Sequence, residues 1–155
     1  MLTRRCLEIL VEQGWPVTVQ TKSPLVLRDI EILKRSANAE VGFTITTAYE
    51  KVRRIFEPGA PSVAARVEAL GILHAEGIKT FVMVAPLLPH AEGLADLLKG
   101  RVDRALIDRY NYHYADRAYK EHGMERAMEE EFFLEKGAEL QAAFEAAGIP
   151  CSALY

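Results

Sequence analysis

The stretch that decides the fold is IKTFVMVAP, residues 78–86, a nearly continuous run of apolar side chains. A run of this kind is typical of a strand buried on both faces, as the strands of a parallel sheet are. β-branched stretches at 17–21 (VTVQT) and 41–47 (VGFTITT) predict two earlier strands. Residues 102–107 and the closing IPCSALY predict two later ones.

Amphipathic patterns with helical spacing separate these strands. They predict helices at residues 2–13, 25–34, 48–56, 63–76, 90–98 and 124–147. Because strands alternate with helices, we expect one α/β domain over residues 1–155, built on a parallel sheet of about five strands with flanking helices. The sheet is either an open, doubly wound one or a partial (β/α) TIM-type barrel, since a complete barrel takes about 250 residues.

The composition is that of a packed globular protein. Nineteen Lys and Arg stand against 22 Asp and Glu, and a formal net charge of −3 offers no overall attraction for nucleic acid. No apolar run approaches the ~20 residues that cross a bilayer, and the N-terminal residues lack the apolar block of a signal peptide. We therefore expect a cytoplasmic protein with no membrane association. Cys6 and Cys151 match no zinc or cluster spacing, so no metal site is predicted from them.

The chain begins with a predicted helix, whereas a β/α arc usually begins with a strand. The strand at 17–21 would then lie at an unprotected edge of the sheet. Two explanations stay open at this point. Either the first helix folds over that edge, or further strands precede it in a longer polypeptide.

Polar side chains gather after the predicted strands, which is where ligands bind in both candidate architectures. Lys22 and Ser23 follow the first strand, Thr44 and Thr46 stand toward the end of the second, and Pro86 ends the third. This separation of polar loops from apolar strands favours a ligand site. Each residue also has an ordinary structural use; Ser23, for example, is a typical cap for the following helix.

The fourth predicted strand is followed by an aromatic loop, DRYNYHY, residues 108–114. His113 lies between two tyrosines at the mouth of the expected pocket. Both simple packing of the tyrosines and a part in catalysis fit this arrangement.

Three segments carry a family resemblance: VTVQTKSPLVLRDIEILKR at 17–35, VGFTITT at 41–47 and FEPGAPSVAARVEALGILHAEGIKTFVMVAPLLP at 56–89. They resemble radical S-adenosylmethionine (radical SAM) proteins of the spore photoproduct lyase-like, or DNA-repair-photolyase-like, group. The combination of TKSPLVLRD with EPxAPS and a following Arg66 is specific. The resemblance implies a partial barrel of about six strands and a [4Fe–4S] cluster in a CxxxCxxC loop after the first strand. It also implies one-electron cleavage of S-adenosylmethionine to a 5′-deoxyadenosyl radical.

The resemblance further implies which residues meet the cofactor. Lys22 would pair with the S-adenosylmethionine carboxylate, Thr44 would hydrogen-bond its methionine or ribose part, and Arg66 would contact the carboxylate or the ribose. The full set implied to bind the cofactor is Lys22, Ser23, Thr44, Thr46, Arg66, Val84 and Pro86. The loop implied to face the substrate is Tyr110, Asn111, Tyr112, His113 and Tyr114.

The sequence departs from the family pattern in one large respect, because it contains no CxxxCxxC motif. The first hypothesis is a fragment or split subunit that binds S-adenosylmethionine and supports radical chemistry only with an upstream segment or partner that supplies the [4Fe–4S] cluster. The alternative is a non-catalytic nucleotide- or partner-binding module without redox chemistry. A nucleic-acid partner is implied by family analogy alone.

Overall fold

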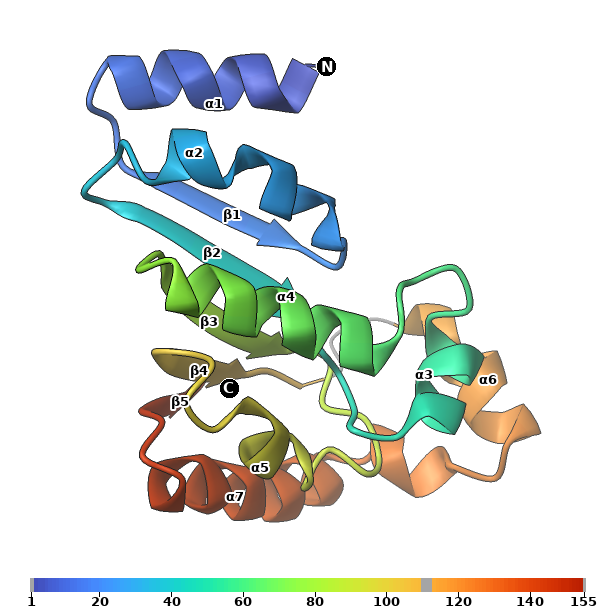
Figure 1. The fold of residues 1–155 in the computed structure, drawn as a ribbon. Helices are drawn as coiled ribbons and strands as arrows, with labels where there is room; N and C mark the ends of the chain where they lie inside the picture. The colour runs from blue at the N-terminus through green and yellow to red at the C-terminus, as the bar shows by residue number, and fades with distance from the viewer. Residues whose placement is uncertain (1, 110–112, 155) are drawn as a thin grey trace.

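The computed structural model describes residues 2–109 and 113–154, and within them five strands form one parallel sheet (Figure 1). The strands are β1 (Val17–Thr21), β2 (Ala39–Thr44), β3 (Lys79–Val84), β4 (Arg104–Ile107) and β5 (Cys151–Ala153). Their spatial order is β1-β2-β3-β4-β5, and every neighbouring pair is parallel. The predicted parallel α/β sheet is confirmed, with the apolar 78–86 stretch supplying its central strand.

Helices connect the successive strands. The α-helices are α1 (Leu2–Glu12), α2 (Ile30–Leu33), α3 (Glu50–Phe56), α4 (Val63–Ala75), α5 (Leu94–Leu98), α6 (Asp116–Glu121) and α7 (Glu130–Ala146). Short 3-10 helices are η1 (Pro24–Asp29), η2 (His113–Ala115) and η3 (Glu125–Met128). Figure 1 shows α3 and α6 beyond the carboxyl ends of the strands, with the other α-helices along the sheet.

The strand order decides between the two expected architectures. When each strand is added beside the last through right-handed crossovers, the connecting helices fall on the same face of the sheet. Buried side chains agree, because Val41, Phe43 and Val82 on this face are 0% exposed and share one core with Leu70 of α4 and Phe144 of α7. The sheet is therefore an arc of a (β/α) barrel, and the doubly wound arrangement is excluded.

The opposite face of the sheet has a different construction. The Phe81 ring lies over Gly42, where an added Cβ would come within 2.1 Å of the ring. The Arg104 guanidinium lies 4.6 Å from the centre of the same ring and donates two hydrogen bonds of 2.8 Å to Glu40. Phe81 is thereby buried by an arginine and its carboxylate partner, and Gly42 permits the close approach.

Helix α1 lies at the β1 end of the sheet and packs against α2 and β1 (Figure 1). Its Leu7 and Val11 are buried in the core, whereas Leu2, Ile9 and the following Trp15 are largely exposed. No strand among the described residues pairs with the other edge of β1.

One strand end and one helix start differ from the prediction, the first at a pair of side-chain hydrogen bonds and the second at a residue with left-handed backbone. β2 ends at Thr44, short of the expected residue 47. The Thr44 carbonyl accepts a hydrogen bond of 2.9 Å from Arg66, and the Thr47 hydroxyl donates one of 2.7 Å to the Pro89 carbonyl. The helix expected from residue 90 begins only at Leu94, since His90 has a left-handed φ of 63° that an α-helix does not accept.

Strand β2 also begins earlier than predicted, at Ala39, and β4 begins later, at Arg104; further differences concern short helices. The helix predicted at 25–34 consists of η1 followed by α2, and the one predicted at 124–147 consists of η3 and α7, separated at Glu129 with its extended backbone. Helix α6 was not expected from the sequence pattern.

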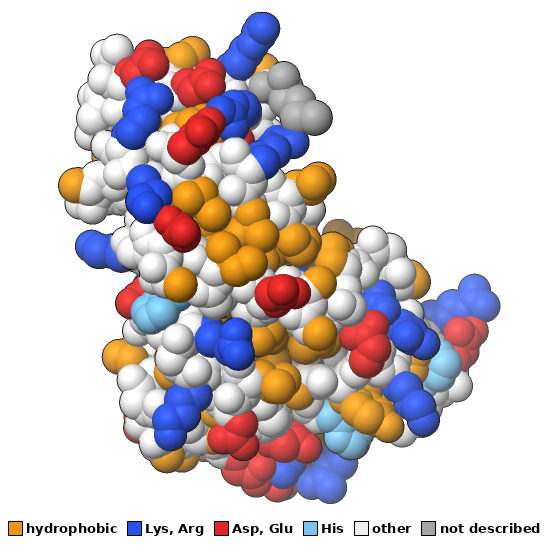
Figure 2. Space-filling model, in the orientation of Figure 1, with side chains coloured by type: hydrophobic (Ala, Val, Ile, Leu, Met, Phe, Trp, Pro, Cys, Tyr) orange, Lys and Arg blue, Asp and Glu red, His pale blue; other side chains and the backbone are white. Residues whose placement is uncertain are grey.

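Charge is distributed without a dominant sign on the face drawn in Figure 2. Basic and acidic side chains are intermixed there over α1 and α2, where Arg4, for example, lies 2.9 Å from Asp29. No helix in residues 2–109 and 113–154 is long and apolar enough to cross a membrane.

Candidate functional site

A cavity of about 360 Å³ opens at the carboxyl ends of the strands. Four consecutive strands contribute the residues that follow them, and the α3 and α6 region closes the other side. We call it the strand-end cavity; its lining residues are Lys22, Thr46, Phe56, Glu57, Ala85, Pro86, Leu88, Asp108, Arg109, Tyr114, Ala115 and Tyr119. The cavity is lined by three residues that the sequence placed at one site although they follow three separate strands: Lys22, Thr46 and Pro86.

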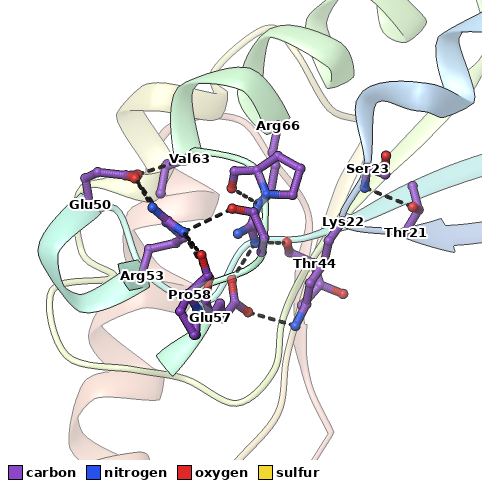
Figure 3. Close-up of polar contacts among 12 residues, drawn as sticks. Thr21, Lys22, Ser23, Thr44, Glu50, Arg53, Glu57, Pro58, Val63 and Arg66 are labelled. Atoms are coloured by element: carbon purple, nitrogen blue, oxygen red, sulfur yellow. Dashed lines mark hydrogen bonds and ion pairs between the residues drawn. The ribbon is translucent and has the colours of Figure 1, made fainter. Parts of the chain in front are cut away.

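A chain of three charged side chains borders this cavity (Figure 3). Lys22 Nζ lies 2.9 Å from Glu57 Oε1, and Arg66 Nη1 lies 2.7 Å from Glu57 Oε2. Exposure falls along the chain, from 45% for the Lys22 side chain to 8% for Glu57 and 0% for Arg66. Glu57 is therefore a nearly buried anion between a fully buried cation and a cation that reaches the cavity.

Arg66 is held by the backbone as well as by Glu57. Its Nε donates to the Pro61 carbonyl and its Nη1 to the Thr44 carbonyl, each at 2.9 Å. Its Nη2 is buried and has no hydrogen-bond partner among the described residues. Arg66 lies behind Glu57 and is not among the residues that line the cavity, so its contact with a cofactor stays a prediction.

The polar residues at the ends of β1 and β2 have separate surroundings. The Ser23 hydroxyl accepts a hydrogen bond of 3.3 Å from the Leu25 amide, the capping geometry its position suggested. Thr44 Oγ1 accepts one of 3.3 Å from Gln20 Nε2. Thr46 is 1% exposed, lines the cavity, and its hydroxyl has no partner among the described residues. A buried hydroxyl without a partner in a cavity wall is the atom a ligand would satisfy.

The structure separates the residues that were predicted to line the adenine and, in the 110–114 loop, to face the substrate. Val84 is 0% exposed and its side chain belongs to the hydrophobic core, whereas Pro86 lines the cavity. Of the loop expected to face the substrate, Tyr110, Asn111 and Tyr112 lie outside the described residues, and His113 begins the 3-10 helix η2. Tyr114 lines the cavity and is 92% exposed.

The turn from 57 to 62, which carries Glu57, is held by a second ion pair (Figure 3). Arg53 Nε donates a hydrogen bond of 3.0 Å to Glu50 Oε1, and Glu50 Oε2 accepts one of 3.1 Å from the Val63 amide. The Arg53 hydrogen bond, followed by that from Val63, holds the pKa of Glu50 below its ordinary value, against the opposing effect of burial.

Sequence reasoning missed several of these residues. Glu57 belongs to the EPxAPS motif, but its position in the sequence does not show that it pairs with two cations. Phe56 and Tyr119 line the cavity without any local signal that could have distinguished them from other residues, whereas Asp108 and Arg109 belong to the 108–114 loop that the sequence placed at the pocket mouth.

Together, the fold and the cavity define a partial barrel with a candidate ligand site at the carboxyl ends of its parallel strands. The model of the radical SAM superfamily matches residues 1–99, and the chain belongs to that superfamily. The family implies S-adenosylmethionine and a [4Fe–4S] cluster as cofactors.

Relatives of this chain are longer proteins. An uncharacterized protein of Methanocaldococcus jannaschii is 35% identical over 88 residues, which cover 57% of this chain and 34% of that protein. An uncharacterized protein of Mycobacterium bovis is 30% identical over 83 residues, covering 52% of this chain and 24% of the relative. The matches thus span about a third or less of these relatives.

The solved structures that match are those of spore photoproduct lyase. The lyase complexed with dinucleoside spore photoproduct superimposes with a TM-score of 0.70 at 17% identity, over 99% of this chain and 55% of the lyase. A mutant of the lyase with bound AdoMet and dinucleoside spore photoproduct gives a TM-score of 0.69 at 17% identity, with the same coverage. At this identity the likeness shows the shared fold.

Proposed function

We propose that this chain binds S-adenosylmethionine in the strand-end cavity and forms the cofactor-binding part of a spore photoproduct lyase-like radical SAM enzyme. The observation that carries the proposal is the pairing of Thr46, a buried hydroxyl without a described partner, with the Lys22 ammonium in one cavity. The volume of about 360 Å³ falls within the range of roughly 300–1,000 Å³ usual for small-molecule sites.

Each lining residue has a task in this proposal that follows from its chemistry. Lys22 supplies a charge-assisted hydrogen bond to the cofactor carboxylate, and Glu57 keeps the ammonium at the cavity wall. The Thr46 hydroxyl donates to or accepts from the ribose or the methionine part. Ala85 and Pro86 give apolar contact to the adenine. Small-molecule sites usually combine such apolar contacts with a few polar groups that fix the orientation of the ligand.

The residues of this chain do not fit the iron–sulfur cluster. Cys6 is exposed on α1 and Cys151 is half-buried at the start of β5, at the other edge of the sheet. Among the described residues, no group of three or more His, Cys, Asp or Glu side chains is placed to hold a metal ion. We therefore propose that a cluster-bearing segment or subunit completes the site.

The edge of β1 that pairs with no described strand is the surface we propose for that segment. Strand β1 runs parallel to β2, and its Thr18 and Gln20 are exposed. A strand added there would extend the arc in the direction in which a barrel closes, and would bring its carboxyl end beside Lys22. A nucleic-acid substrate remains a prediction by analogy with the lyase.

The second candidate is a module that binds the nucleotide-like cofactor without redox chemistry. The absence of a cysteine cluster in the described part of the chain favours it. The two candidates differ in what happens after anaerobic reconstitution with iron, sulfide and the cluster-bearing partner. Absorption near 400 nm together with cofactor cleavage supports the radical enzyme, and unchanged cofactor supports the binding module.

Both candidates require that the strand-end cavity bind S-adenosylmethionine. Calorimetric titration of the cofactor into the isolated chain tests this binding. The matched variants are Lys22→Met and Lys34→Met, because Lys34 also forms a lysine–glutamate ion pair, 2.8 Å from Glu76, but lies away from the cavity. We expect Lys22→Met to weaken binding about tenfold or more, as the loss of a charge-assisted hydrogen bond does, and Lys34→Met to leave it unchanged. Equal affinities of all three proteins would contradict the assignment of Lys22.

A further inference from the structure

The turn from 57 to 62 is held in place by polar contacts. Pro58 and Gly59 at its tip are exposed, and a Cβ added at Gly59 would have no atom within 4 Å. One backbone hydrogen bond crosses the turn, from the Ala60 amide to the Glu57 carbonyl at 3.0 Å. The exposed tip of a short turn depends on side-chain contacts for a fixed conformation.

Arg53 supplies most of those contacts, beside the hydrogen bond of 2.9 Å that Arg66 Nε donates to the Pro61 carbonyl. Its Nη1 lies within hydrogen-bonding distance of three carbonyls of the turn, at 2.9 Å from Glu57, 3.0 Å from Ala60 and 3.4 Å from Pro58. The Arg53 side chain is only 9% exposed, although it comes from the last turn of α3. A guanidinium presents several donors in a fixed plane, which suits a set of carbonyls that converge on one point.

Glu50 joins the two helices that flank the turn, and we call Arg53 and Glu50 together the clamp of this turn. One carboxylate oxygen binds Arg53 within α3, and the other accepts from the Val63 amide in the first turn of α4. The turn is therefore tied at its start through Arg53 and at its end through Glu50. Figure 3 shows this clamp next to the Lys22–Glu57–Arg66 chain, with Glu57 common to both.

We infer that Arg53 is a positioning residue for the cofactor site, acting through Glu57 on Lys22. By fixing the backbone carbonyl of Glu57, Arg53 sets where the Glu57 carboxylate stands, and that carboxylate holds Lys22 at the cavity wall. Arg53 is not among the lining residues, so its effect is indirect. The inference rests on the proposed function only in the statement that the cavity binds S-adenosylmethionine; the geometry itself does not depend on it.

Zero-length cross-linking tests the geometry without the cofactor. A water-soluble carbodiimide activates a carboxylate, and an amine in contact displaces the activated group to form an amide, so a Lys22–Glu57 cross-link reports their contact. Mass spectrometry should find this cross-link in the native chain, and at least about fivefold less of it in Arg53→Gln, as expected when a turn loses its fixing contacts. Absence of the cross-link from the native chain, or an equal yield in Arg53→Gln, would overturn the inference.

Arg54→Gln is the matched control, because Arg54 is the neighbouring arginine, lies 3.6 Å from the same Glu50 oxygen, and is 72% exposed. It should cross-link as the native chain does, and a drop as large as that of Arg53→Gln would contradict a specific role. If Arg53→Gln does not fold, as judged by circular dichroism, Glu50→Gln takes its place. That variant removes the counterion of Arg53 but keeps an oxygen that can accept from Val63, and it should lower the cross-link by about twofold.

A double-mutant cycle on cofactor affinity tests the connection to Lys22. Arg53→Gln should raise the dissociation constant for S-adenosylmethionine about tenfold in the native background and less than about twofold when Lys22 is already Met. An equal effect in both backgrounds would show that Arg53 does not act through Lys22. If the native chain binds no S-adenosylmethionine, the proposed function fails, while the cross-link still decides whether Arg53 positions Lys22.

Discussion

Replacing Glu57 by Gln should strongly destabilise the fold, because Arg66 would lose its counterion in a fully buried site. Arg66 is 0% exposed and lies 2.7 Å from Glu57, so the guanidinium cannot turn to water. Breaking a buried ion pair by removing one partner destabilises a protein by about 3–5 kcal/mol. This is a large part of the roughly 5–15 kcal/mol by which a domain is stable.

Urea unfolding followed by circular dichroism measures the effect. With a denaturant dependence of about 2 kcal/mol per molar urea, a loss of about 4 kcal/mol lowers the unfolding midpoint by about 2 M. Lys22→Met is the control from the other side of the same carboxylate. Lys22 is 45% exposed, and such a pair contributes about 0–1 kcal/mol, so its midpoint should move by no more than about 0.5 M.

The difference between the unfolding midpoints of Glu57→Gln and Lys22→Met tests whether Glu57 is the counterion of buried Arg66. If Glu57→Gln unfolds within about 0.5 M urea of the native chain, as Lys22→Met should, then Glu57 is not the counterion of Arg66. A large loss for Lys22→Met as well would refute the distinction between a buried and an exposed partner.

Three further predictions follow from other parts of the fold. Gly42→Ala should destabilise by about 1–3 kcal/mol in urea unfolding, because its Cβ would overlap the Phe81 ring; an unchanged midpoint would show that the ring moves freely. Ser62→Ala should cost about 1 kcal/mol in the same assay, since the hydroxyl caps α4; no loss would mean that the cap is redundant. Burial, with a nearby carboxylate adding to it, raises the pKa of Cys151 to about 11. Iodoacetamide at pH 8 should therefore alkylate exposed Cys6 first, and Cys151 should react appreciably only as the pH approaches 11; equal rates at pH 8 would contradict this.

Much of the fold could be predicted from local patterns. The strand at 17–21 has the expected bounds, and β3 lies within the apolar 78–86 stretch, because a buried parallel strand needs apolar side chains on both sides. Helix α4 likewise begins at Val63, after a serine that caps it. Local chemistry determines these elements, so the sequence suffices for them.

The rest depended on contacts between residues far apart in sequence. Arg66, near the start of α4, is fully buried and donates to the Thr44 carbonyl, 22 residues away, a partner that no local pattern indicates. The same contact explains why β2 ends earlier than its β-branched pattern suggests. Glu57 joins two cations that come from different elements, and no local pattern shows such a meeting.

The part of the candidate site that the sheet topology determines could be predicted from the sequence. Parallel strands bring their carboxyl ends to one edge, and this rule alone placed Lys22, Thr46 and Pro86 at one cavity. It could not reveal Tyr119, because Tyr119 lies on α6, a helix between β4 and β5 that the sequence pattern did not predict.

The most direct test of the central claim is a crystal structure of this chain grown with saturating S-adenosylmethionine. We expect the cofactor in the strand-end cavity, with its carboxylate within hydrogen-bonding distance of Lys22 Nζ and a polar atom within reach of Thr46 Oγ1. Cofactor bound elsewhere on the chain, or bound in the cavity without contact to either residue, would contradict the account.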